Sequence, residues 1–81
     1  MPLRIAELMR TAPDWVHADL LSAEVTGWLD RAYQTVREID PIEAGCLQVY
    51  AQHLRTDVRR HSAEIIATMH RVELKLLEER R

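Results

Sequence analysis

Residues 40–54 read DPIEAGCLQVYAQHL, and this stretch decides the fold because it holds the strongest break in a chain of helix-forming residues. Asp40 offers an acceptor side chain at an N-cap, Pro41 stands at the first helical position, and Glu43 stands at the third. Proline also disfavours the helical conformation at the preceding residue and lacks the N–H that an earlier helix needs to continue. We therefore predict that one helix ends at residue 39 and that another begins at residue 41.

The chain after this break reads as one long helix. No glycine or proline follows Gly45. Apolar-side positions recur at steps of three and four residues, which is the spacing of one face of a helix. These positions are Leu47, Tyr50, Leu54, Val58, His61, Ile65, Met69, Val72 and Leu76. The pattern predicts a single helix over residues 41–80.

Two further helices are predicted before the break. Thr11 followed three residues later by Asp14 has capping-box spacing and predicts a helix over residues 12–39. Residues 2–10 predict a short helix, which must dock on another element because isolated helices under about 12 residues are marginal in water. The apolar side of the 12–39 helix consists of Ala18, Leu21, Val25, Trp28, Ala32, Val36 and Ile39.

These elements predict an all-α fold within a single helical domain, residues 1–81. The short joint at Asp40 favours an antiparallel helical hairpin with a long second helix, preceded by the short N-terminal helix. Folded back from the joint, the first helix covers the second only as far as about residue 67, so the second overhangs by about four turns of 3.6 residues each. The overhang carries apolar residues on more than one side and therefore needs a cover.

The uncovered apolar overhang predicts a surface for a protein partner. We expect the chain to oligomerise into a helical bundle, as a dimer or larger, or to bind a larger protein, or both. The predicted function is a small non-enzymatic protein–protein interaction module, such as an adaptor, a regulatory subunit or an assembly factor. The predicted interface residues are Ile65, Ile66, Met69, Val72, Leu74, Leu76 and Leu77, together with Leu8 and Trp15.

Composition narrows the classes of function and compartment. The formal net charge is −2, so no strong overall field recruits nucleic acid or an acidic membrane. A single cysteine excludes an internal disulfide and suits a reducing compartment. No apolar run approaches the roughly 18 residues of a membrane span, and the start of the chain has no signal-peptide pattern. We predict a cytoplasmic protein without a membrane segment.

The sequence shows no pattern typical of an active site, and we predict no catalytic residue, cofactor or metal. It has no glycine-rich phosphate loop and no Cys-x-x-Cys pair. His61 and His70 are nine positions apart and so lie about 180° from each other on one helix. Cys46 has no histidine within one turn and reads as a packing residue. An enzyme is therefore not expected.

Two alternatives remain open. Arg55, Arg59 and Arg60 form a basic cluster, and a nucleic-acid-associated regulator is the class of function that such a cluster suits, although Asp57 interrupts it. The other alternative comes from a resemblance. The Asp-Pro joint followed by Leu47, Tyr50 and Leu54 resembles needle-type subunits of bacterial type III secretion and their small co-chaperones, which implies a secretion-apparatus subunit or its chaperone.

Overall fold

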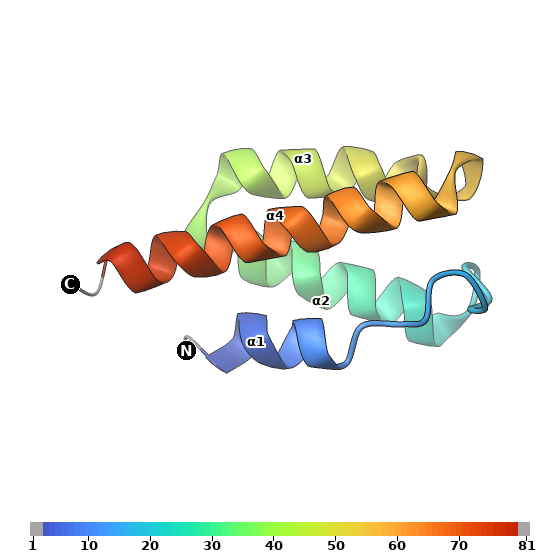
Figure 1. The fold of residues 1–81 in the computed structure, drawn as a ribbon, viewed down its shortest axis with the longest axis horizontal. Coiled ribbons are helices and arrows are strands. Elements are labelled where there is room, and N and C mark those ends of the chain that lie inside the picture. The colour runs from blue at the N-terminus through green and yellow to red at the C-terminus, as the bar shows by residue number, and fades with distance from the viewer. Residues whose placement is uncertain (1–2, 80–81) are drawn as a thin grey trace.

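The computed structural model describes residues 3–79, and the regular elements in this range are all helical. The prediction of an all-α fold is confirmed. The helices pack into a bundle that measures 39 × 20 × 17 Å, in which α4 lies between α3 and α1 in the view of Figure 1, with α2 behind. The elements are α1 (Leu3–Arg10), α2 (Ala23–Ile39), α3 (Pro41–Gln52), a short 3-10 helix (Leu54–Thr56) and α4 (Val58–Glu79).

Asp40 forms the joint between α2 and α3, at the position that the sequence indicates. Its backbone N–H donates to the carbonyl of Val36 at 2.7 Å and so closes α2. Its carboxylate accepts hydrogen bonds from the backbone N–H groups of Ile42 at 3.0 Å and Glu43 at 3.3 Å. One residue therefore ends one helix and caps the next, and Pro41 occupies the first turn as expected.

The prediction of a single helix over residues 41–80 is wrong, because the chain turns back between Gln52 and Val58; residue 80 itself lies outside the described residues. The Thr56 hydroxyl donates to the carbonyl of His53 at 2.6 Å. The carboxylate of Asp57 accepts a hydrogen bond from the backbone N–H of Arg60 at 3.2 Å, which caps the start of α4. Short polar side chains compete in this way for backbone groups that a continuous helix would use.

The prediction of a helix over residues 12–39 is also wrong in its start, since α2 begins at Ala23. Ser22 is the true cap, and its hydroxyl accepts a hydrogen bond from the backbone N–H of Val25 at 3.2 Å. Thr11 instead donates its hydroxyl to the carbonyl of Glu7 at 2.9 Å, at the end of α1. The short helix predicted over residues 2–10 is observed as Leu3–Arg10, and residue 2 lies outside the described residues.

The core draws on every helix, and Trp28 fastens α1 to it. The indole Nε1–H of Trp28 donates to the carbonyl of Leu8 at 2.9 Å in a buried position. Trp15 meets Trp28 edge to face, with ring centroids 5.4 Å apart. These contacts explain how a helix as short as α1 is held, because it could not persist alone. The largest fully buried side chains are Trp28, Ile5, Leu47, Ile65, Met69, Val25, Val36, Val72 and Thr68.

Candidate functional site

The centre of the predicted interface is part of the core of this fold. Ile65, Met69 and Val72 on α4 have no exposed surface, and Leu8 on α1 is only 9% exposed. They pack against α1, α2 and α3 because the turn after α3 brings α4 back over the rest of the chain. The predicted apolar overhang therefore does not exist, and Ile65, Met69 and Val72 cannot touch a partner in this conformation.

The other predicted interface residues lie nearer the surface. Trp15, Ile66 and Leu76 are half-buried and pack against the core from its edge. Leu74 and Leu77 are exposed by 58% and 52%, and both belong to the C-terminal turns of α4. Of the predicted set, only these last two present most of their apolar side chain to a partner.

A second apolar surface, which the sequence analysis missed, lies on α3. We define the outer face of α3 by Ile42, Gly45 and Val49, which are spaced three and four positions apart and so share one side of the helix. Ile42 is 79% exposed and Val49 is 51% exposed. No Asp, Glu, Lys or Arg occurs from Ala44 to Leu54, and the exposed Gln52 follows Val49 by three positions on the same side. The apolar spacing through Leu47 marks the side of α3 that turns inward and does not indicate the opposite side.

Two ion pairs join α4 to the start of α3 and its cap. Arg71 Nε lies 2.8 Å from Glu43 Oε2, and Lys75 Nζ lies 2.9 Å from Asp40 Oδ2. The hydrogen bond from the Lys75 ammonium, together with those from backbone N–H groups, holds the pKa of Asp40 below its ordinary value. The hydrogen bond to the Asp40 carboxylate raises the pKa of Lys75 above its ordinary value. All four charges are thus neutralised within the chain.

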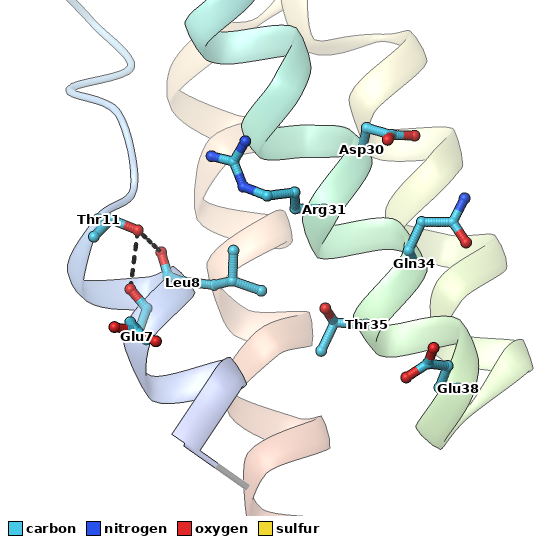
Figure 2. A pocket seen from close by; sticks show the side chains of 8 residues that line it. All are labelled: Glu7, Leu8, Thr11, Asp30, Arg31, Gln34, Thr35 and Glu38. Atoms are coloured by element: carbon cyan, nitrogen blue, oxygen red, sulfur yellow. Dashed lines mark hydrogen bonds between the residues drawn. The ribbon is translucent and has the colours of Figure 1, made fainter. Parts of the chain in front are cut away.

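A groove of about 580 Å³ runs between α1 and α2 (Figure 2). Leu8 and the side chains of Arg31, Thr35 and Glu38 border it, whereas Asp30 and Gln34 point away from α1. The volume lies within the range of about 300–1,000 Å³ that is usual for small-molecule sites. Seven of the eight lining residues are polar or charged, although their side chains also contribute apolar surface. The lining residues are Glu7, Leu8, Thr11, Asp30, Arg31, Gln34, Thr35 and Glu38.

The groove can offer hydrogen bonds and charge to a ligand. Its lining contains carboxylates, one guanidinium, one amide and two threonine hydroxyls, without histidine, cysteine or lysine. Thr11 already donates its hydroxyl to the carbonyl of Glu7 at 2.9 Å. A nucleophile activated by a neighbouring base needs both groups within hydrogen-bond reach, and this lining does not provide such a pair.

The turn between α3 and α4 brings together two histidines that are distant on a continuous helix. The rings of His53 and His61 have centroids 6.3 Å apart. Nδ1 of His61 lies 3.6 Å from Glu64 Oε1, beyond hydrogen-bonding distance, and has no hydrogen-bond partner. Within residues 3–79 no group of three or more His, Cys, Asp or Glu side chains is arranged to hold a metal ion.

The basic cluster lies around the same turn. Arg60 Nε donates to Glu64 Oε1 at 3.1 Å, so one of its three charges is paired. Arg55 and Arg59 are exposed, and no ion pair involves either side chain among residues 3–79. Asp57 lies between them in sequence. Two free guanidinium groups near one acid form a small electropositive area rather than a continuous basic stripe.

Comparison with known proteins gives no relative from which a function could be carried over. No helix within residues 3–79 is both long enough and apolar enough to cross a lipid bilayer. No protein-family model, curated protein or solved structure matches this chain.

Proposed function

We propose that this protein is a small non-enzymatic protein–protein interaction module that works in the cytoplasm as an adaptor, a regulatory subunit or an assembly factor. The observation that carries the proposal is the exposure of Leu74 and Leu77, 58% and 52%, on the C-terminal turns of α4. Residues three positions apart are neighbours on a helix surface, so the two leucines form one apolar spot. The proposal assigns no catalytic residue, cofactor or metal.

The mode of binding follows from the position of this spot. Recognition of a helix by an apolar groove depends on anchors spaced three, four and seven residues apart, and Leu74 and Leu77 have the first of these spacings. Leu76, between them in sequence, is half-buried and packs against the core. The last turns of α4 are thus held on the bundle by one leucine while two others face outward to enter a groove on the partner.

The test is affinity purification from the native cell with three tagged forms of the full chain. The first is wild type, the second carries Leu74→Lys and Leu77→Lys, and the control carries Val16→Lys and Leu21→Lys. The control pair is equally suited to substitution, since Val16 is 56% exposed and Leu21 is 69% exposed. It belongs to the segment between α1 and α2, at the opposite end of the bundle from the C-terminal turns of α4 (Figure 1). We expect one protein to be captured by wild type and by the control and to be lost with the α4 variant.

Binding of the purified partner then gives the magnitude. Truncation of an interface anchor typically costs more than 1 kcal/mol, so the α4 double variant should weaken binding by about 10-fold to 100-fold. Capture that is equal for all three forms would refute the role of Leu74 and Leu77. Failure of wild type to enrich any protein over a tag-only control would refute the proposed function itself.

A nucleic-acid-associated regulator is the second candidate, and it is favoured by Arg55 and Arg59, which are exposed and form no ion pair with another residue in the described range 3–79. Phosphate contacts by such groups make affinity fall with salt, with a slope of about −0.9 per phosphate on duplex DNA. Titration of fluorescent duplex DNA and single-stranded RNA at low salt tests it. Binding that weakens with salt and is lost with Arg55→Ala and Arg59→Ala would support this candidate, and no binding at low salt would exclude it.

A further inference from the structure

The joint before α3 and the joint before α4 are built in the same way, with one difference. Asp40 and Asp57 each cap the helix that follows through the side-chain carboxylate. Both have an extended backbone, with φ and ψ of −150° and 98° for Asp40 and of −156° and 90° for Asp57. Pro41 follows Asp40, whereas Val58 follows Asp57. Proline in a helix interior removes a backbone hydrogen bond and clashes with the preceding turn, so it bars a continuous helix at the first joint alone.

The second joint is close to helical in its backbone. It covers residues 53–57, at the end of the bundle opposite the C-terminal turns of α4 (Figure 1). Leu54–Thr56 already form a 3-10 helix, which is a tighter form of the α-helix. His53 has φ and ψ of −102° and 7°, next to the helical region, so Asp57 is the residue that departs from it most. Rotation at Asp57, with small adjustments before it, would join α3 to α4.

The sequence favours this continuous helix over residues 41–79. The joint contains neither glycine nor proline, and the apolar spacing runs through it. Leu47, Leu54 and Ile65 are separated by seven and eleven positions, which are about two and three helical turns. All three side chains are buried in the closed chain. On the continuous helix they would share one side, and that side would need a cover.

A second copy of the chain supplies this cover, because the surface that fits α4 is the one that α4 occupies in the closed chain. There α4 packs on α1, α2 and α3 and buries Ile65, Met69 and Val72 completely. Two ion pairs also join it to the start of α3 and its cap. An opened chain exposes both the seat that α4 leaves and the side of α4 that fitted it. Two opened chains can exchange α4 and rebuild these contacts between them, which is domain swapping.

We propose that Asp57 is a hinge at which α3 and α4 join into one helix over residues 41–79, and that two chains opened in this way exchange α4 to form a domain-swapped dimer. The dimer goes beyond the proposed function and uses core contacts instead of Leu74 and Leu77, so each can fail without the other. The closed and exchanged forms share their core contacts. The Kd is therefore close to the effective concentration of α4 in its own chain, about 1 mM for a short connection.

Two substitutions at the hinge shift this equilibrium in opposite directions. Asp57→Ala removes a cap that only the closed form uses and places the best helix former at the hinge. Loss of a cap changes an equilibrium about fivefold, and a dimer contains two hinges, so the Kd should fall about 25-fold or more. Val58→Pro repeats the Asp40-Pro41 pair at the start of α4. Proline suits this first helical position but blocks a continuous helix, so it should abolish the dimer, also when combined with Asp57→Ala.

Sedimentation equilibrium of the full chain measures the dimer, after refolding from urea at each concentration so that α4 can exchange. Wild type should be half dimer by mass at about 1 mM, and Asp57→Ala at about 40 μM or below. The matched control is Ser22→Ala, which removes the cap of α2. Residues 11–22 before this cap form no regular helix that α2 could join, so the control should leave the Kd unchanged.

A distance within one chain distinguishes exchange of α4 from a contact between closed chains. Glu43 and Arg71 pair at 2.8 Å in the closed chain, whereas on one continuous helix their 28 positions correspond to about 42 Å. Spin labels are attached to Glu43→Cys and Arg71→Cys in a chain that also carries Cys46→Ser and Asp57→Ala. Diluted with unlabelled Asp57→Ala chain, the dimer should show the long distance and the monomer the short one.

Four results would each overturn the proposal. They are a wild type that stays monomeric at about 2 mM, twice the expected Kd, and a dimer in which the labels show only the short distance. An equal gain of dimer from Asp57→Ala and Ser22→Ala would show that loss of stability, not the hinge, causes association. A dimer that survives Val58→Pro would show that no continuous helix is needed.

Discussion

Replacement of Trp28 by phenylalanine should loosen α1 from the bundle. The helix has 8 residues and cannot persist alone, so its docking depends on a few contacts. One of these is the buried hydrogen bond of 2.9 Å from the indole N–H of Trp28 to the carbonyl of Leu8. This carbonyl lies in the last turn of α1, where carbonyls lack partners within the helix. Phenylalanine keeps an aromatic ring in the core but has no N–H to donate.

The expected loss of stability is about 2–3 kcal/mol. A buried acceptor left without its donor costs about 1–3 kcal/mol. The lower half of that range applies, because the Thr11 hydroxyl still reaches the Leu8 carbonyl at 3.4 Å. The smaller ring leaves a void that adds about 1 kcal/mol, a fraction of the 3–5 kcal/mol for removal of a whole aromatic ring. A domain of 81 residues has a total stability of roughly 4–12 kcal/mol, so the loss is a large share of it.

Urea unfolding followed by the remaining tryptophan measures this loss, and hydrogen exchange locates it. The matched control is Trp15→Phe, since Trp15 packs edge to face on Trp28 but is only half-buried and should cost no more than about 1 kcal/mol. Amides of α1 should lose more protection in Trp28→Phe than amides of α4. Equal losses of stability in the two variants, or equal losses of protection in the two helices, would refute the role given to this hydrogen bond.

Three further predictions concern stability. The pairing of Asp40 with Lys75 lowers the pKa of Asp40 and raises the pKa of Lys75, so the pair's contribution to stability is complete between the ordinary pKa values of 3.8 and 10.5. This contribution is lost as the pH falls below the first value or rises above the second. Asp40→Asn, which keeps an N-cap, should lack both of these losses in melting curves recorded against pH. Gly45→Ala should raise the free energy of unfolding by about 0.5–1 kcal/mol in dilute solution, as measured by urea unfolding. Ile65→Ala should cost about 2–5 kcal/mol and Leu77→Ala less than about 0.5 kcal/mol in the same assay, and equal costs would contradict their placement in and out of the core.

The joint at Asp40 could be predicted because its chemistry is local. A capping carboxylate and a proline act within one turn, whatever the rest of the chain does. The burial of Val25, Trp28 and Val36 could also be predicted, since a regular apolar spacing marks one face of a helix wherever that helix lies. Leu21 shows the limit of the same spacing: it continues the pattern but is 69% exposed, because Ser22 caps α2 after it.

The turn after α3 could not be found from the strongest signals. No glycine or proline marks it, and Leu54 keeps the apolar spacing because the short 3-10 helix continues the rotation of the chain. The signal that was available is Thr56 followed by Asp57, two residues that favour caps and turns over helix interiors. Such a pair is also found inside helices, so tertiary packing decides, and in this chain the buried Leu54 lies within the turn and the buried Ile65 follows it on α4.

This single turn also explains why most of the predicted interface is buried. An apolar stripe shows that a helix has a partner, but the spacing is the same whether the partner belongs to the same chain or to another. With α4 extended, Ile65, Met69 and Val72 would need a second molecule; with α4 folded back, the chain covers them itself. What remains for other proteins is the apolar surface that the folded chain does not cover. In this bundle that surface includes Leu74 and Leu77 on α4 and the outer face of α3.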